Sequence, residues 1–467
     1  NGLAVGADGT VTDTVGVRAC YGTEHDEELA AAERQRLVDA CVADINQIVR
    51  KAADVDADLG RLFASIEQGR LAALDSATLA GARTQGFEAG DAARSVLPPP
   101  GDGGAPAADN AGWWAGLSDA EREQIIAAHP DWIGNLDGVD FRARDRANRE
   151  LLDDHRAALE RERADLERQL HDLSLTEKAF GSPHADELWN RLQENKDKQA
   201  SLDTVDRVLA RGGRQLVGLD LGHGRAQGVI AVGDLSTADH VAVFTPGLTS
   251  TVQGIEGNDQ RMAELKRETE KQLSDSGETG TVATVTWVGY QAPQLSADSL
   301  FSSNSVALDE AARDGGRDLA EFYRGINASR ATDPDLTAIG HSYGSTTTGF
   351  ALREDTGVDR AAFVGSPGLG TDSLTDLRVP TGQSYYGEAT WDGVGDFGRF
   401  GTDPSDLAGM RHLETREATA PDGTHLDGVR GHTSYLQDRS TSQYNLAVLA
   451  AGHPELVIEG RNVGITG

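Results

Sequence analysis

Cysteine is scarce in this chain of 467 residues, which contains only Cys20 and Cys41. Two thiols are too few for a framework of disulfides or for a zinc site. Cys41 falls on the apolar face of an expected helix, where a free thiol packs as a small hydrophobic group. A Cys20–Cys41 disulfide remains an alternative, and it would indicate an oxidising compartment.

The chain also lacks long apolar runs, and its acidic residues outnumber its basic ones. No apolar run approaches the length of a membrane span. The formal net charge of −32 argues against nucleic acids, anionic membranes and polyanionic substrates as partners, because like charges repel. The first residue is Asn1 rather than Met, which leaves room for a signal peptide that has already been removed. We expect a secreted or cell-surface protein rather than a cytoplasmic one, and the sequence does not predict an oligomeric state.

Helical patterns dominate the first half of the chain. Residues 3–17 are an exception, since they alternate weakly around the turn signal Asp8-Gly9 and predict a hairpin. Apolar side chains recur every three or four positions over residues 27–68, and a second helical stretch covers residues 71–96. Residues 98–112 are rich in proline and glycine, which predicts a linker or loop.

A second helical region follows this expected linker. Ser118 and Glu121 have the spacing of a capping box at the start of a short helix. Leucine then recurs every seven positions over residues 141–173, and a helical pattern resumes over residues 186–210. Two such helices with a short connection predict an antiparallel hairpin packed like a coiled coil. We therefore divide the chain into a helical region with its linker at 1–112, a helical hairpin region at 113–213 and a third domain at 214–467.

The third domain alternates strands with helices. Helical patterns lie at residues 258–273, 307–327, 345–354 and 434–451. Short strand-like runs lie at residues 215–221, 228–232, 240–245, 281–288, 335–339, 360–364 and 383–386. This alternation predicts an α/β fold with a mostly parallel sheet covered by helices on both faces. The first strands precede any helix and are expected to form an antiparallel edge.

One stretch of this domain carries a motif with chemical meaning. Residues 335–350 read DLTAIGHSYGSTTTGF, a buried strand followed by the pattern G-x-S-x-G and a helix. This is the context of a nucleophile elbow, in which a strained turn lifts a serine hydroxyl out of the sheet. The glycines two positions before and after Ser342 leave room for that turn. The helix that follows favours negative charge beside the hydroxyl.

A serine nucleophile needs a base, and the base needs an orienting carboxylate. In the α/β-hydrolase fold the chain order is serine, acid, histidine. His432 lies in a short loop before the last expected helix, where the base belongs, and it is preferred over His412, His425 and His453.

The acid is expected after the next-to-last strand. Asp392, in a glycine-flanked turn, is our choice, with Asp396 as its rival and Glu388 as a further alternative. Asp403 precedes a proline and is expected to cap a turn instead.

The oxyanion of such a reaction needs two backbone N–H donors. The first is that of Tyr343, directly after the serine. The second is expected from Leu248, which follows the sharp turn signal Pro246-Gly247 at the end of a strand.

Several blocks of the sequence resemble an uncharacterised α/β-hydrolase-like domain of actinobacterial proteins. The blocks are VFTPGLTST, WVGYQAP, IGHSYGS, FGTDP and GHTSYL, together with WWAGLS, IGNLDGV and RDRAN in the helical region that commonly precedes that domain. The resemblance implies that Ser342 is the nucleophile and His432 the base. Members often carry Gly-Asp-Pro-Val where this chain has Trp391-Asp392-Gly393-Val394. The resemblance brings no established substrate.

The sequence thus predicts an α/β-hydrolase fold preceded by an all-α domain, and a serine hydrolase that cleaves a small-molecule ester or acyl substrate without metal or organic cofactor. The alternatives are a peptidase or amidase with the same triad, and an export-linked or cell-surface interaction protein that uses the fold as a scaffold. The helical half is expected to shield or shape the mouth of the active site.

Overall fold

The computed structural model describes residues 3–5, 11–13, 98–100, 104–174, 177, 182–294, 306–394 and 400–460. The chain divides into two units, Asn1–Arg94 and Ser95–Gly467. In the first unit, β1 (Leu3–Val5) pairs antiparallel with β2 (Val11–Asp13), which confirms the predicted hairpin. Cys20, Cys41 and the helices expected over 27–68 and 71–96 lie outside the described residues.

The second unit is built on an eight-stranded sheet with the strand order β10-β9-β8-β7-β5-β6-β4-β3. The six strands β6, β5, β7, β8, β9 and β10 pair in parallel with their neighbours in the sheet. In contrast, β4 pairs antiparallel with both β6 and β3. The predicted parallel sheet and its antiparallel edge are therefore both confirmed. The strands are β3 (Arg214–Asp220), β4 (Gln227–Val232), β5 (His240–Thr245), β6 (Val282–Val288), β7 (Asp335–His341), β8 (Arg360–Val364), β9 (Ser384–Gly387) and β10 (Arg411–His412).

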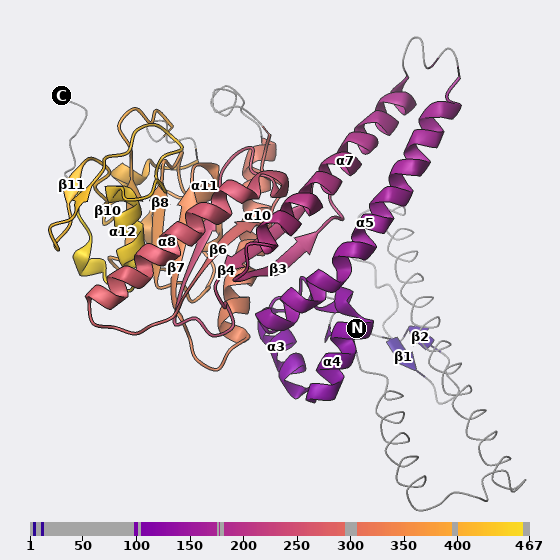
Figure 1. Cartoon of the computed structure of the whole chain (residues 1–467), viewed down its shortest axis with the longest axis horizontal. Helices are drawn as coiled ribbons and strands as arrows, with labels where there is room; N and C mark the ends of the chain where they lie inside the picture. The colour runs from indigo at the N-terminus through magenta and orange to yellow at the C-terminus, as the bar shows by residue number, and fades with distance from the viewer. Residues whose placement is uncertain are drawn as a thin grey trace, which may run out of the picture. The chain divides into compact units, whose positions relative to one another are not determined.

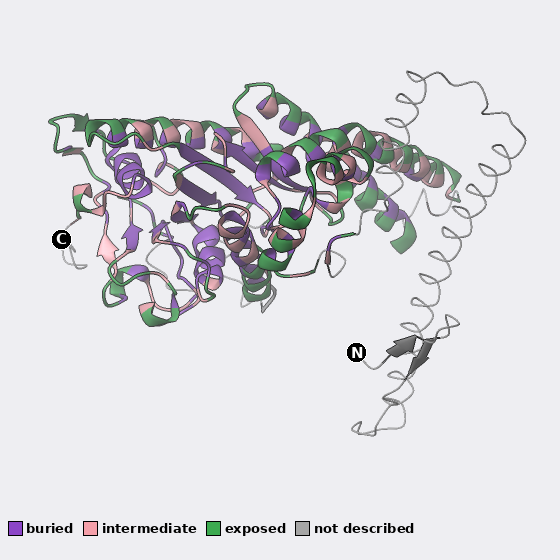
Figure 2. Cartoon of the chain, turned by 90° about the horizontal axis from the view of Figure 1, so that it is seen from below, coloured by how far each residue is buried: buried purple, intermediate pink, exposed green. Residues whose placement is uncertain are grey.

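Helices cover both faces of the sheet. The apolar side chains of the central strands alternate between the two faces, as β-geometry requires. On β5, Val241 and Val243 face the core under α10 (Val306–Ala328) and α11 (Tyr343–Ala351). Ala242 and Phe244 face the core under α8 (Ile255–Asp275) and α12 (Thr441–Ala450). Figure 2 shows these strands as the buried centre of the unit.

Four helices precede the sheet in the described part of this unit. Figure 1 shows the two long ones, α5 and α7, lying side by side as the predicted antiparallel hairpin. Leu152, Leu159 and Leu166, three of the leucines spaced by seven, are buried along their seam. The capping box of Ser118 and Glu121 is present at the second helix. The four are α3 (Ala107–Gly116), α4 (Asp119–Ala128), α5 (Phe141–Asp172) and α7 (Pro183–Leu209).

The expected linker over residues 98–112 is partly wrong, because α3 begins inside it at Ala107. Proline sits directly before the first turn, where it costs no hydrogen bond, and alanine is the best helix former. The buried Asn110 amide also donates to the carbonyls of Ala105 and Asp137, at 3.1 and 3.0 Å, which ties the helix to the following loop. Composition alone gave no sign of this tertiary anchor.

The edge strand β3 is covered by side chains of the helical region. The Asn135 amide accepts from Leu219 N and donates to Leu219 O, both at 2.7 Å. Asp145 accepts from Leu216 N at 2.6 Å, and Asn148 donates to Leu216 O at 2.9 Å. The unpaired backbone N–H and C=O groups of an exposed edge strand can pair with other chains, and here these side chains bind them instead. The blocks IGNLDGV and RDRAN therefore act as the cover of the sheet edge.

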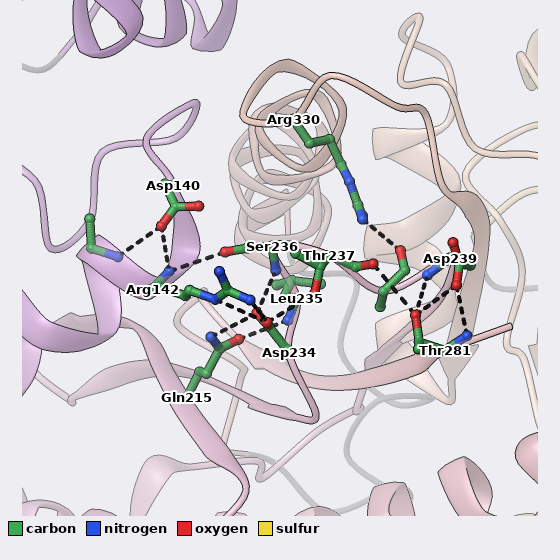
Figure 3. Close-up of polar contacts among 12 residues, drawn as sticks. Asp140, Arg142, Gln215, Asp234, Leu235, Ser236, Thr237, Asp239, Thr281 and Arg330 are labelled. Atoms are coloured by element: carbon green, nitrogen blue, oxygen red, sulfur yellow. Dashed lines mark hydrogen bonds and ion pairs between the residues drawn. The ribbon is translucent and has the colours of Figure 1, made fainter. Parts of the chain in front are cut away.

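A second group of polar contacts joins α5 to the turn between β4 and β5 (Figure 3). Arg142 binds Asp234 through its guanidinium and donates its backbone N–H to Ser236 Oγ at 3.2 Å. The Gln215 side chain accepts from Leu235 N at 2.8 Å, which fixes the same turn. These contacts lie at the end of the sheet where β5 begins, and they are partly exposed, so the ion pair itself stabilises little.

Two details of the last third differ from expectation. The final helix was expected from residue 434 but begins at Thr441, where the Ser440 side chain accepts from Gln443 N. Residues 411–426 contain short strands that no pattern predicted, β11 (Ala418–Thr419) and β12 (His425–Leu426) in addition to β10. The 3₁₀ helices are η2 (Pro130–Trp132), η3 (Val252–Gly254), η4 (Leu374–Asp376), η6 (Pro404–Asp406) and η7 (Pro454–Leu456).

Candidate active site

Ser342 occupies the sharp turn between β7 and α11. Its backbone has φ 56° and ψ −135°, in the left-handed half of conformational space that a non-glycine residue rarely adopts. The two motif glycines allow the turn, because a Cβ on Gly340 would lie 2.6 Å from Ser345 Cα and one on Gly344 would lie 2.2 Å from Thr245 O. Ser342 N donates to Val364 O at 3.0 Å, which holds the turn against β8. Such held strain is a mark of functional turns.

His432 and Asp392 meet beside this turn although forty positions separate them in the chain. His432 Nδ1 lies 2.9 Å from Asp392 Oδ1 and 3.0 Å from Oδ2. The carboxylate is 0% exposed, whereas the imidazole is 25% exposed. An Nδ1–H that donates to the carboxylate leaves Nε2 as the basic nitrogen.

The Asp392 carboxylate is held by donors on several sides. Tyr435 Oη donates to Oδ2, and Val394 N donates to Oδ1 at 3.1 Å. Burial disfavours the charged form, but the hydrogen bond and charge of His432 and the bonds from Tyr435 and Val394 outweigh it and hold the pKa of Asp392 below its usual range. The carboxyl is therefore ionised at neutral pH and able to orient the imidazole.

A glycine makes room for this pair. Gly365 follows β8 with φ +56°, and a Cβ there would lie 2.6 Å from Asp392 Oδ2, 2.9 Å from Tyr435 Cε2 and 3.1 Å from His432 Nδ1. Its N–H donates to Gly387 O at 3.0 Å, so the main chain is fixed at this point. Any larger residue would displace the histidine, the acid or both.

Ser342 and His432 open into one cavity of about 480 Å³. Its walls come from the loop after β5, from α8 and from the segment after His432. The lining residues are Phe244, Pro246, Gly247, Leu248, Thr249, Ser250, Asn258, Arg261, His341, Ser342, Val364, His432, Thr433, Tyr435 and Leu436. None of the described residues of this unit that precede β3 lines it, so the helices α3, α4, α5 and α7 do not shape this cavity as we expected.

The loop after β5 packs directly on the serine. A Cβ on Gly247 would lie 2.5 Å from Ser342 Cβ and 2.9 Å from its Oγ. Tyr290 Oη donates to Pro246 O at 2.8 Å, and Thr249 N donates to Pro293 O at 3.0 Å, which pins the loop from both sides.

The predicted oxyanion donors lie at this junction. The backbone N–H groups of Tyr343 and Leu248 have no hydrogen-bond acceptor among the described residues. Leu248 is part of the loop that packs on Ser342, and Tyr343 directly follows the serine. Both groups are therefore free to bind an incoming acceptor.

The family of the chain can now be assigned. A family model described as alpha/beta hydrolase matches residues 222–402. The uncharacterised protein Mb0988c of Mycobacterium bovis is 31% identical over 265 residues, which cover 54% of this chain and 96% of that protein. The uncharacterised protein Rv2079 of Mycobacterium tuberculosis is 29% identical over 471 residues, covering 92% of this chain and 69% of that protein.

This chain belongs to the α/β-hydrolase family. Its relatives in mycobacteria confirm the predicted resemblance to uncharacterised actinobacterial proteins. Among solved structures, a hyperthermophilic esterase from the archaeon Pyrobaculum calidifontis is 12% identical and covers 59% of this chain and 98% of that chain, with a TM-score of 0.31.

The other described residues considered as base or acid lie elsewhere in this α/β-hydrolase. His412 stacks on Tyr386 with ring centroids 4.6 Å apart, and a Cβ on Gly460 would touch its ring. His425 is exposed on β12, and His453 pairs with Glu455. Glu388 does not line the cavity. Asp403 caps a 3₁₀ helix as expected. Asp396 lies outside the described residues.

Three residues of this hydrolase's site escaped the sequence analysis. Tyr435 binds the Asp392 carboxylate, Tyr290 binds the loop after β5, and His341 binds the main chain of His432. His341 Nε2 lies 2.6 Å from the His432 carbonyl oxygen, so its N–H fixes the main chain of that loop. Burial, and then the neighbouring His432, lower the pKa of His341 to about 4, which keeps the ring neutral. Tyr435 and Tyr290 lie within the blocks GHTSYL and WVGYQAP, which were the available signal.

The described residues contain neither a metal-binding cluster nor a membrane-spanning helix. Among them, no cluster of three or more histidine, cysteine, aspartate or glutamate side chains is arranged to hold a metal ion. Within the same residues, no helix combines the length and the apolar character needed to cross a bilayer.

Proposed function

We propose that this α/β-hydrolase cleaves a carboxylic ester through an acyl-enzyme, with Ser342 as nucleophile, His432 as base and Asp392 as the orienting acid. The observation that carries the proposal is the hydrogen bond of 2.9 Å between His432 Nδ1 and the buried carboxylate of Asp392. His432 lines the same cavity as the strained Ser342. A carboxylate on Nδ1 sets the tautomer that makes Nε2 a base, which is the role an acid plays in such triads.

The first half-reaction forms the acyl-enzyme. His432 Nε2 takes the hydroxyl proton as Ser342 Oγ attacks the ester carbonyl carbon. The resulting oxyanion accepts hydrogen bonds from the backbone N–H groups of Tyr343 and Leu248, which need no reorganisation because the loop is already pinned. When the C–O bond to the alcohol breaks, His432 gives its proton to the departing oxygen.

The second half-reaction repeats these steps with water. His432 takes a proton from a water molecule as the water oxygen attacks the acyl carbon. The bond to Ser342 Oγ breaks, the proton returns to the serine, and a carboxylic acid leaves. Asp392 stays ionised throughout and stabilises the imidazolium that forms at each stage.

The test compares the parent chain with Ser342→Ala on a p-nitrophenyl ester. We expect the variant to fold and to lose on the order of 10⁴-fold to 10⁶-fold in kcat, as removal of a triad member does. Ser405→Ala, at an exposed position outside the cavity, is the matched control and should keep the parent rate. A folded Ser342→Ala protein with the parent rate would show that the nucleophile is wrongly assigned. A parallel assay on p-nitroanilides distinguishes an esterase from an amidase or peptidase.

A further inference from the structure

One wall of the cavity is formed by α8, which contributes two polar side chains. Asn258 and Arg261 both line the cavity that contains Ser342 and His432. They are three positions apart, so they lie on the same face of the helix. Arg261 is exposed and Asn258 is half-buried. Neither residue is needed for the chemistry proposed above.

Arg261 has no anionic partner in the described part of the chain. Asp259, its near neighbour on α8, is buried and binds Arg211 and Arg214 instead, at 3.2 and 3.1 Å. Glu264, one turn further along the helix, accepts from Gln260 Nε2 at 3.1 Å. Among the described residues, nothing accepts a hydrogen bond from Arg261 or forms an ion pair with it. Its guanidinium therefore keeps all of its N–H donors for a ligand.

The residues that line the cavity include positive charge but no negative charge, whereas the molecule as a whole is acidic. The lining contains no aspartate or glutamate, although the chain carries a net charge of −32. Apolar side chains such as Phe244, Leu248 and Leu436 surround the polar groups. A charge in a concave and partly apolar site acts more strongly than one on open surface. Arg261 is also one of the charges that lower the pKa of His341 at the cavity floor, after burial and His432.

We propose that Arg261, assisted by Asn258, binds an anionic group of the substrate, so that the enzyme prefers esters carrying a carboxylate a few bonds from the reacting carbonyl. This inference rests on the proposed esterase function and names its substrate class. A guanidinium matches the two oxygens of a carboxylate with two parallel N–H bonds, which gives both affinity and orientation. A single negative charge gains this contact, whereas a polyanion is repelled by the net negative charge of the chain.

The experiment measures kcat/KM for matched esters. Mono-p-nitrophenyl adipate and p-nitrophenyl hexanoate have acyl chains of equal length, but only the first ends in a carboxylate. The acetate ester of 5-hydroxy-2-nitrobenzoic acid, compared with p-nitrophenyl acetate, places the carboxylate on the leaving group instead. We expect Arg261→Gln to lower the ratio of anionic to neutral kcat/KM by on the order of tenfold to a hundredfold in at least one pair. The pair that responds identifies the side of the ester that carries the charge.

Two further variants separate a contact from a general charge effect. Arg267→Gln removes an exposed positive charge from the same helix but outside the cavity, and should leave both ratios unchanged. Arg261→Lys keeps the charge without the fork and should give an intermediate ratio. An equal fall in Arg267→Gln, or no change in either pair with Arg261→Gln, overturns the inference while leaving the esterase proposal intact. If the folded parent hydrolyses none of the four esters, the esterase proposal itself is wrong and the inference fails with it.

Discussion

His341 should make the stability of the fold depend on pH in a predictable direction. Its ring packs beside Phe244, His432 and Tyr435, and its Nε2–H donates to the His432 carbonyl. Burial, then the charge of His432 and least of all Arg261 disfavour a proton on this ring. The bond to the His432 carbonyl and the charge of Asp392 favour the proton but are outweighed, and the pKa falls to about 4. Protonation keeps the Nε2–H bond to the carbonyl but places a positive charge on a ring shielded from water, which costs free energy.

The direction of this pH dependence follows from the pKa of His341 in the folded and unfolded states. An unfolded histidine has a pKa of about 6.5, so between pH 6.5 and pH 4 the unfolded chain binds more protons at this site than the folded one. Stability is therefore fully present above pH 6.5 and falls as the pH drops towards 4. With a shift of about 2.5 units, the loss between about pH 7 and about pH 4.5 is on the order of 2 kcal/mol.

The assay compares the parent with His341→Gln in urea denaturation followed by tryptophan fluorescence at these two pH values. Glutamine keeps an N–H donor but does not titrate, so other groups cancel in the difference between the two proteins. We expect the parent to lose about 2 kcal/mol more than the variant on acidification. Equal losses in both proteins would refute the account of His341 as a ring that stays neutral in the folded protein.

Three substitutions test the geometry around the serine. Gly365→Ala should abolish ester hydrolysis because the added Cβ would displace Asp392 and His432. The control is Gly382→Ala, which also has a positive φ but has open space around it and should keep the activity. Equal activities of the two variants would contradict the packing argument. Tyr435→Phe removes a donor to the carboxylate and should lower kcat/KM on the order of tenfold; an unchanged kcat/KM would exclude this role. Asp392→Asn should cost about 10²-fold to 10⁴-fold in kcat, and a mild effect would place the acid elsewhere.

The sheet was predictable because its strands obey simple patterns. Buried parallel strands appear as short apolar runs, and the bounds expected for β4, β5 and β8 differ from the observed ones by one residue at most. Ser342, His432 and Asp392 also meet in the structure, because the chain order of the fold brings the ends of neighbouring strands to one edge. Their catalytic roles stay predictions until activity is measured.

The features that were predicted wrongly or not at all share one physical cause: they depend on tertiary contacts. Residues 434–440 look helical by composition, but Tyr435 turns inward to bind Asp392 and the helix starts only at the Ser440 cap. Likewise α3 forms in a stretch that resembles a linker because Asn110 anchors it to the loop of Asp137. Side chains that bind main-chain carbonyls distant in the sequence, such as Tyr290 and His341, leave no periodic signal in a single sequence.

The central claim is that Ser342 is an activated nucleophile, and covalent labelling tests it most directly. The full-length protein is treated with a fluorophosphonate probe, and the modified peptide is identified by mass spectrometry. The account predicts one adduct, on Ser342, formed much more slowly in folded His432→Ala because the base that removes the hydroxyl proton is gone. An adduct on another serine, equal labelling of the His432→Ala variant, or no labelling of the folded parent would contradict it.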